Sequence, residues 1–394
     1  MSAHRLAWDK KELQDWLRLS LTPGVGSVGA RKLLTRLGSP AAVFAAPVAE
    51  TQQCVSLAQA AQLRHVPDGF AQALETTWAW LNTTSAHTAH ALLAWGDPRY
   101  PEGLLQTADP PLLLYVLGPR AWLEQGHPLV DWQRSLAIVG SRNPTPQGQE
   151  HARQFAQHLA GQGWSIVSGM ALGIDAAAHE GALAAGRAGI ATVAVVGTGL
   201  DRVYPRQHKQ LAHEIARHGL VISELPLGTA PISANFPKRN RLISGLSRGT
   251  LVVEAALASG SLITARTAVE QGREVFAIPG SVHAPQARGC HALIRQGAKL
   301  VESAQDILEE FPDMGAPLPA MAPAEAAAIA VTPVPGRLLH PLLQALGHDP
   351  ASLDVLGART GWDTAQLQAQ LMELELDGWL VRLPGGLYQR TAQV

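Results

Sequence analysis

A short stretch in the middle of the chain carries residues suited to nucleic-acid binding. Four cations and an aromatic ring lie between Asn235 and Arg248, and no acidic residue occurs from Pro231 to Val253. Cationic side chains attract phosphates, and an aromatic side chain can stack on an unpaired base. The stretch predicts binding to a nucleic-acid backbone. The alternative is a basic loop that is only solvated. Its ring and cations are Phe236, Lys238, Arg239, Arg241 and Arg248.

Glycine-containing turns after two apolar segments could meet the same ligand. Gly140, Ser141 and Arg142 follow one segment, and Ser168 and Gly169 follow the next. A glycine has no Cβ, so the backbone N–H groups of such a turn can approach an anion closely. Because parallel strands end at one edge of a sheet, we expect these turns to face one crevice.

The elements that must position these residues alternate between strands and helices. From residue 86 to 310, short apolar runs alternate with helix-length amphipathic segments. This pattern is typical of a parallel sheet that helices cover on both faces. We predict an α/β domain with an extended Rossmann-like, doubly wound, mostly parallel sheet. The expected strands are 112–117, 136–139, 164–167, 190–196, 220–223, 251–253 and 274–278.

Two smaller domains are expected on either side of the sheet. Residues 1–85 predict a helical domain of the helix-hairpin-helix or SAM-like kind, with a break at Pro23 and Gly24. Its turn and the cations that follow could contact DNA, or the hairpin could only pack. Residues 311–335 are rich in Ala and Pro and predict a linker. Residues 336–394 predict a winged-helix domain.

The charge of this last domain argues against binding to duplex DNA. From Gly336 onward there are four Lys and Arg residues against six Asp and Glu residues. The expected recognition helix, 364–376, contains no cation. A helix that enters a phosphate-lined groove should carry positive charge. We therefore predict that the domain serves protein contact.

Composition excludes several classes of function. The 394 residues have a formal net charge of −1, which excludes a globally basic nucleic-acid coat. The two cysteines form neither a disulfide framework nor a paired zinc motif, and the histidines lack metal-ligand spacing. Neither Gly-x-Gly-x-x-Gly nor a P-loop occurs. We expect no cofactor, no metal and no catalytic group, and hence no enzyme activity.

The sequence also predicts a location and the roles of a few single residues. The most apolar run, 190–196, is too short to cross a bilayer, so we expect a cytoplasmic protein without a membrane partner. His179 and His291 are interpreted as packing or capping residues. Asp175 is either a helix-start residue stabilised by the helix dipole or a ligand.

Seven stretches of this sequence resemble the DNA-processing protein A (DprA/Smf) family. They occur in the family's order across about residues 90 to 310. The resemblance implies a recombination mediator that binds single-stranded DNA, forms a homodimer, protects incoming DNA and loads RecA recombinase during natural transformation. The matching stretches are 96–101, 137–142, 168–179, 236–241, 252–255, 259–265 and 275–280.

The resemblance also implies which residues carry the function. His291, Ile294 and Leu300 become candidates for the dimer interface, and Glu254 is assigned to orienting a cation or an amide in the crevice. The implied DNA-binding residues are Gly140, Ser141, Arg142, Ser168, Gly169, Phe236, Lys238, Arg239, Asn240 and Arg241.

An enzyme remains the alternative. Some Rossmann-like relatives hydrolyse nucleoside monophosphates with an Arg and a Glu near a Pro-Gly-Gly-x-Gly-Thr turn. Here the corresponding turn, 246–250, lacks Pro-Gly-Gly, although Thr250 and Glu254 keep part of the spacing. A nucleotide phosphoribohydrolase-type activity is therefore the competing hypothesis.

Overall fold

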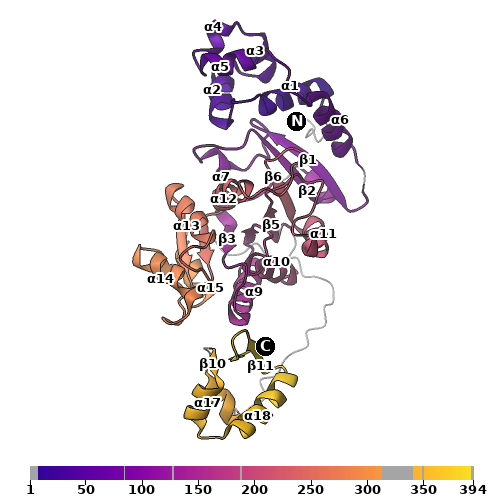
Figure 1. The fold of residues 1–394 in the computed structure, drawn as a ribbon. Coiled ribbons are helices and arrows are strands. Elements are labelled where there is room, and N and C mark those ends of the chain that lie inside the picture. The colour runs from indigo at the N-terminus through magenta and orange to yellow at the C-terminus, as the bar shows by residue number, and fades with distance from the viewer. Residues whose placement is uncertain are drawn as a thin grey trace.

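The protein has three parts that follow one another along the chain (Figure 1). The computed structural model describes residues 8–83, 85–126, 128–186, 189–312, 340–347 and 350–391. Most of the predicted linker lies outside these residues. Helices stand at one end, a large sheet with its helices lies in the middle, and a small α/β unit stands at the other end (Figure 1).

The N-terminal part consists of short helices that pack against the edge of the sheet. Their apolar sides form one core, which also takes in Leu92 and Tyr115 from the first two strands. The predicted break lies between the first two helices, where Gly24 has a φ of 76° that favours glycine. The helices are α1 (Lys10–Leu21), α2 (Ser27–Leu37), α3 (Pro40–Ala45), α4 (Val48–Thr51), α5 (Leu57–Gln62) and α6 (Phe70–Leu81).

The middle part is a nine-stranded, mostly parallel sheet within the described residues. The strand order is β1-β2-β6-β5-β4-β3-β7-β8-β9, and only the pairs β1–β2 and β2–β6 among these are antiparallel. The predicted fold class is confirmed. The strands are β1 (Thr88–Ala94), β2 (Leu113–Pro119), β3 (Ser135–Val139), β4 (Ser165–Ser168), β5 (Thr192–Val195), β6 (Leu220–Ser223), β7 (Gly249–Val252), β8 (Glu274–Ala277) and β9 (Lys299–Leu300).

Helices cover both faces of the sheet, and the strands supply alternate residues to the two cores. In β3, Leu136 and Ile138 face one core, whereas Ala137 and Val139 face the other. The core that contains Leu136 and Ile138 also contains residues of α9 (Pro146–Gly161), α10 (Ile174–Ala184) and α15 (Ala304–Glu309). On the other face lie α7 (Glu102–Leu105), α8 (Arg120–Glu124), α12 (Asn235–Gly245), α13 (Ser261–Glu270) and α14 (Arg288–Arg295), and α11 (Lys209–His218) packs near β5 and β6.

The chain reverses its direction of travel across the sheet beside β3. From β3 it proceeds through β4, β5 and β6 on one side, and then returns to β7, β8 and β9 on the other side. The connections after β3 and β7 therefore diverge and leave a crevice at the carboxyl ends of these strands. This position is where ligands bind in open α/β sheets.

The C-terminal part has the predicted winged-helix plan. It contains α16 (Pro341–Leu346), α17 (Leu353–Thr360) and α18 (Thr364–Leu376), with a sheet of β10 (Ala351–Ser352), β12 (Leu387–Arg390) and β11 (Leu380–Leu383). One residue assigned to the linker belongs elsewhere. Phe311 is buried in the core of the large sheet, where its ring packs against Trp164 and Phe276. An aromatic residue beside an Ala/Pro-rich segment gave no sign of this burial.

Candidate nucleic-acid interface

A cavity of about 740 Å³ opens at the carboxyl edge of the sheet. Its walls are the turn after β3, the loop after β7 and the first turns of α12. The predicted residues Gly140, Ser141 and Arg142 line it, and so do Phe236, Arg239 and Asn240. The structure thus brings together residues that lie about a hundred positions apart in the sequence. We call this cavity the crevice.

The basic stretch that suggested nucleic-acid binding forms helix α12, not a loop. Its cations have different surroundings. Lys238 is exposed in the first turn, whereas Arg239 is buried and Arg241 is half-buried. Arg248 lies at the start of β7, at the opposite edge of the sheet, with its guanidinium 4.5 Å from the centre of the Phe311 ring. The charge of this stretch is therefore divided between the surface and the interior.

Arg239 is buried and holds the wall of the crevice together through hydrogen bonds; we call this set of contacts the brace. Only 5% of its surface is exposed, and its Nη1 donates to the carbonyl oxygens of Gly169, at 2.6 Å, and Val195. Its Nε donates to the side-chain oxygen of Asn240 at 2.9 Å. The helix α12 is thereby tied to the ends of β4 and β5. This guanidinium is occupied by protein acceptors, so it positions the crevice and does not itself reach into solvent.

A buried carboxylate completes this brace. Asp175, in the first turn of α10, accepts hydrogen bonds from the backbone N–H groups of Gly169, at 3.1 Å, and Ala171, at 3.2 Å. Burial raises the pKa of Asp175, whereas the nearby Arg239 charge and these N–H groups lower it. The turn that both side chains hold contains Met170, whose φ of 57° is uncommon for a residue with a Cβ. Asp175 thus holds this turn at the lining of the crevice, as a residue at the start of a helix.

Ser168 and Gly169 lie behind the crevice wall. The Ser168 hydroxyl is fully buried and donates to the carbonyl oxygen of Ile138 at 2.6 Å. A Cβ at Gly169 would collide with the guanidinium of Arg239. The predicted phosphate contact of these two residues does not fit this arrangement. Their small size instead leaves room for the Arg239 side chain.

Arg241 is neutralised by acids on both sides. Its guanidinium pairs with Glu224, and its Nε lies 3.0 Å from a carboxylate oxygen of Asp109. The side chain is 17% exposed. The basic stretch itself contains no acidic residue, and Asp109 and Glu224 lie far from it or before it in the sequence. The sequence alone therefore gave no sign of these two partners.

Two aromatic rings lie at the mouth of the crevice. The centres of the Phe236 and Tyr204 rings are 5.6 Å apart, and 46% of Tyr204 is exposed. The exposed Arg142 guanidinium lies 5.7 Å from the centre of the Phe236 ring. Rings beside a cation suit a base that carries a phosphate. Tyr204 was not predicted, although the basic residues Arg202, Arg206 and Lys209 around it are a signal that could have found it.

Helix α13 begins at the opposite wall of the crevice. Ser259, Gly260, Ser261 and Thr264 all line the cavity. The first turn of α13 contains no acidic residue. Its backbone N–H groups at Ser261, Leu262 and Ile263 already donate to oxygens of Ser259 and Gly260. The Ser259 and Ser261 hydroxyl oxygens lie 2.7 Å apart. This wall offers small donors, while α12 and the turn after β3 offer charge and rings.

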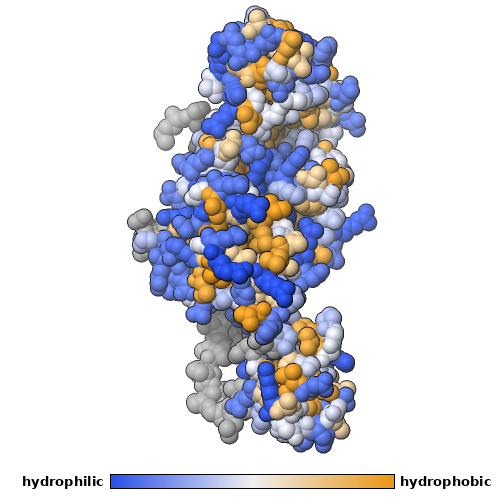
Figure 2. Space-filling view, turned by 60° about the vertical axis from the view of Figure 1, so that its left-hand side comes forward, coloured by the Kyte–Doolittle hydropathy of each residue, from blue (hydrophilic) through white to orange (hydrophobic). Residues whose placement is uncertain are grey.

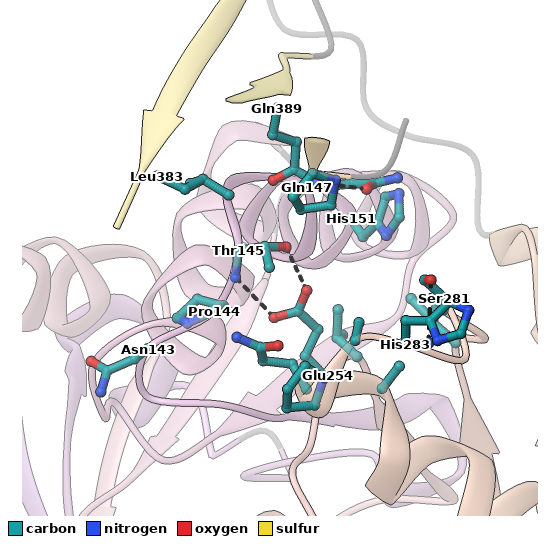
Figure 3. Close-up of a pocket in the computed structure, with 18 of the residues that line it drawn as sticks. Asn143, Pro144, Thr145, Gln147, His151, Glu254, Ser281, His283, Leu383 and Gln389 are labelled. Carbon is teal, nitrogen blue, oxygen red and sulfur yellow. Dashed lines mark hydrogen bonds between the residues drawn. The ribbon is translucent and has the colours of Figure 1, made fainter. Parts of the chain in front are cut away.

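The start of α9, by contrast, already holds a carboxylate. Glu254 follows β7 and accepts hydrogen bonds from the Thr145 backbone N–H, at 2.9 Å, and from the Thr145 hydroxyl, at 2.5 Å (Figure 3). Burial raises the pKa of Glu254, and these two hydrogen bonds oppose the rise. A Cβ at Gly148 would collide with this carboxylate. Glu254 therefore orients a backbone amide, which is one of the two roles predicted for it.

A second cavity of about 620 Å³ lies on the far side of this contact. The start of α9 and the loop after β8 line it, and so does the wing of the C-terminal domain through Leu383 and Leu387 (Figure 3). Gln389 of the wing donates a hydrogen bond to the Gln147 side chain at 3.0 Å. The wing therefore touches the sheet domain directly behind the turn that carries Arg142.

The described residues contain no cluster of metal ligands. No group of three or more His, Cys, Asp or Glu side chains in this part of the chain could hold a metal ion. His179 is fully buried, and its Nδ1 lies 2.7 Å from the Thr192 hydroxyl. Burial lowers the pKa of His179 to about 3, so it stays neutral and packs in the core. No helix in the described ranges is long and apolar enough to cross a membrane.

Comparisons with known proteins identify the family. A family model described as DNA recombination-mediator protein A matches residues 91–312, and one described as DprA winged helix domain matches residues 321–386. The first match alone covers more than half of the chain. The chain belongs to the DNA recombination-mediator protein A family.

Relatives of this family match most of the chain. Protein Smf of Escherichia coli is 41% identical over 323 residues, which are 80% of each chain. The DNA processing protein DprA of Bacillus subtilis is 45% identical over 216 residues, 55% of this chain and 69% of that protein. The X-ray structure of DNA processing protein A from Streptococcus pneumoniae matches with a TM-score of 0.61 and 35% identity, over 77% of this chain and 98% of that one.

The three residues predicted for a family dimer interface belong to α14 and to the edge strand β9 that follows it. Leu300 belongs to β9 and is 48% exposed, while His291 and Ile294 are half-buried in α14. His291 Nε2 lies 3.0 Å from the carbonyl oxygen of Gly280. On this side of the molecule, hydrophobic residues lie exposed among hydrophilic ones (Figure 2).

The brace at Arg239 can be tested through stability. Replacing Arg239 by Ala removes its hydrogen bonds to Gly169 and Val195 and takes the nearby positive charge away from the buried carboxylate of Asp175. Leaving a buried charge uncompensated costs about 3–5 kcal/mol. We expect Arg239→Ala to lower the free energy of unfolding strongly at neutral pH, measured by urea denaturation. Without the arginine the pKa of Asp175 rises further, so this loss should shrink as the pH falls and the carboxylate becomes protonated.

The exposed Arg142 provides the matched control. Arg142→Ala removes the same side chain from the surface of the same site and should change stability by less than about 0.5 kcal/mol. Equal stability of the two variants would contradict the bracing role of Arg239.

Proposed function

We propose that the crevice binds single-stranded DNA and that the protein acts as a recombination mediator through it. The observation that carries this proposal is the pair of rings, Phe236 and Tyr204, beside the exposed guanidinium of Arg142. Stacking platforms combined with local cations are how proteins hold unpaired strands. A duplex keeps its bases stacked on each other and offers no free face to these rings.

The charge of the crevice supports the same proposal. The chain has a net charge of −1, so an anionic polymer is attracted only where cations are concentrated. Arg142 and Lys238 are exposed at the crevice wall and in the first turn of α12. The start of α13 adds the hydroxyl groups of Ser259 and Ser261 on the opposite side. A strand that crosses the crevice could meet all three.

Family membership extends the proposal to partners. We propose that the chain forms a homodimer through the surface around His291, Ile294 and Leu300. In this assembly it would protect incoming single strands and load RecA onto them in the cytoplasm during natural transformation. The exposed apolar side chain of Leu300 on an edge strand supports the dimer, because such an edge favours pairing with another chain.

Salt dependence of binding tests the two cations. Each phosphate contact to a single strand contributes about −0.7 to the slope of log affinity against log salt concentration. We expect Arg142→Ala and Lys238→Ala each to make the slope less negative by about that amount, in anisotropy titrations of a labelled oligothymidylate. Arg217→Ala is the matched control, since Arg217 lies near the start of β6 at the other edge of the sheet. An unchanged slope in both crevice variants would remove them from the DNA contact.

Stacking should have a different signature. Phe236→Leu keeps an apolar side chain but removes the π-face, so we expect affinity to fall by about 1–3 kcal/mol. The salt slope should stay that of the wild type because no charge is removed. The titration used for the cations measures both quantities. Undiminished affinity would show that the base does not stack on this ring.

We also propose that the protein is not an enzyme. In the competing phosphoribohydrolase hypothesis, Glu254 would act on a nucleotide. Both of its oxygens accept hydrogen bonds from Thr145, and its carboxylate occupies the start of α9, where a nucleotide phosphate would otherwise be favoured. This arrangement supports a structural role for Glu254.

Incubation with AMP tests this proposal. We expect no adenine to be released above the rate of a protein-free blank, measured by liquid chromatography. Release by the wild type that Glu254→Gln abolishes would overturn the proposal and favour the hydrolase. Glu254→Gln keeps the size of the side chain, so its folding can be verified in the same samples by circular dichroism.

A further inference from the structure

Helix α18 of the winged-helix domain is apolar on two opposite sides. Its inner side, Leu367, Leu371 and Leu374, packs into the core of the domain. Its outer side carries a second row of apolar residues at spacings of four, three and four, which places them along one line of a helix. These residues are Ala365, Ala369, Met372 and Leu376, all exposed. We call them the α18 stripe.

The exposure of the α18 stripe is unusual for a solvated helix. Met372 is 64% exposed and Leu376 is 80% exposed. The outer side of a surface helix normally carries polar residues. Two large apolar side chains on successive turns therefore indicate a contact surface. Helix α18 lies farther from the large sheet than the wing, which touches the sheet domain through Gln389 (Figure 1).

The surroundings of the α18 stripe are acidic. From Asp363 to Val381 the chain has four Asp and Glu residues and no Lys or Arg. Glu373 and Glu375 are exposed beside Met372 and Leu376. The domain's described cations belong to other elements: Arg359 donates to the carbonyl oxygens of α16, Arg382 lies over the Tyr388 ring, and Arg390 ends β12. A phosphate backbone would be repelled here.

We propose that the α18 stripe is a docking surface for a basic amphipathic helix of a partner protein. Apolar anchors of the partner would pack between Met372 and Leu376, and its Lys and Arg side chains would pair with Glu373 and Glu375. Helix-on-helix recognition uses this combination of an apolar seam and flanking opposite charges. The flexible Met372 side chain can adapt to different anchors. This contact does not depend on DNA binding in the crevice.

The negative charge around the α18 stripe favours a basic partner helix over a second copy of this chain. Two α18 stripes facing each other would bring Glu373 and Glu375 of both copies close together, and like charges at such distances destabilise a contact. A cationic partner removes this repulsion. Complementary charge thus gives the surface a preferred partner chemistry.

Calorimetric titration of the full chain with a synthetic peptide tests the proposal. The probe is a helical peptide of leucine and lysine with its leucines on one face. We expect it to bind the wild-type chain, and to bind about tenfold more weakly after Met372→Gln combined with Leu376→Gln, a loss of about 1.4 kcal/mol. Leu57→Gln is the matched control, because Leu57 is an equally simple surface leucine, 67% exposed, on a helix of the N-terminal part.

Three results would overturn the proposal. The first is the absence of binding by the wild-type chain, and the second is equal binding by the double variant and Leu57→Gln. The third is equal binding of a peptide of the same composition with its leucines scattered around the helix, which would show attraction by charge alone. Replacing Glu373 and Glu375 by Gln should weaken binding and reduce its salt dependence.

Light scattering of the same variants distinguishes the other occupant. We expect Met372→Gln with Leu376→Gln to leave the molecular mass in solution unchanged. A fall in mass that is confined to this double variant would assign the α18 stripe to a contact between copies and overturn the proposal.

Discussion

The hydrogen bonds of the buried Arg239 guanidinium are the interaction on which the crevice depends. They fasten α12 to the ends of two neighbouring strands, while Asp175 holds the same turn from α10. An arginine can brace several carbonyl oxygens at once because its donors form a rigid fork. With α12 fixed in this way, Phe236 and Lys238 in its first turn have defined positions. The most deeply buried cation of the basic stretch thus orients the exposed side chains that we propose for DNA binding.

The cations of the crevice fall into two groups by their surroundings. Arg239 and Arg241 are held by protein acceptors, whereas Arg142 and Lys238 face solvent. The two helix starts near the crevice also differ in charge. The carboxylate of Glu254 fills the start of α9, whereas the first turn of α13, which lines the crevice, has no acidic residue. A neutral protein can attract a polyanion only if its exposed cations are concentrated, and this arrangement concentrates them.

The sequence was sufficient for the fold class, for seven of the nine described strands of the large sheet and for the neighbourhood of the site, whereas the edge strand β1 was not predicted. Buried parallel strands such as β3 and β4 are continuous apolar runs, so their places and their common edge could be predicted. The two-residue β9 is too short to leave a pattern. The roles of the individual cations could not be predicted from the sequence. Arg239 becomes buried, and Arg241 meets its acidic partners, only when segments that are distant in the sequence come together. The contribution of Tyr204 likewise comes from a contact across the fold.

The most direct test of the account is to locate a bound strand on the protein. An oligothymidylate with 5-iodouracil substitutions can be crosslinked by light to the aromatic residues that it stacks on, and mass spectrometry of peptides then maps the attachment. The account predicts attachment at Phe236 or Tyr204, the rings at the mouth of the crevice. Attachment confined to the N-terminal helices or to the winged-helix domain, with none at the crevice, would contradict it.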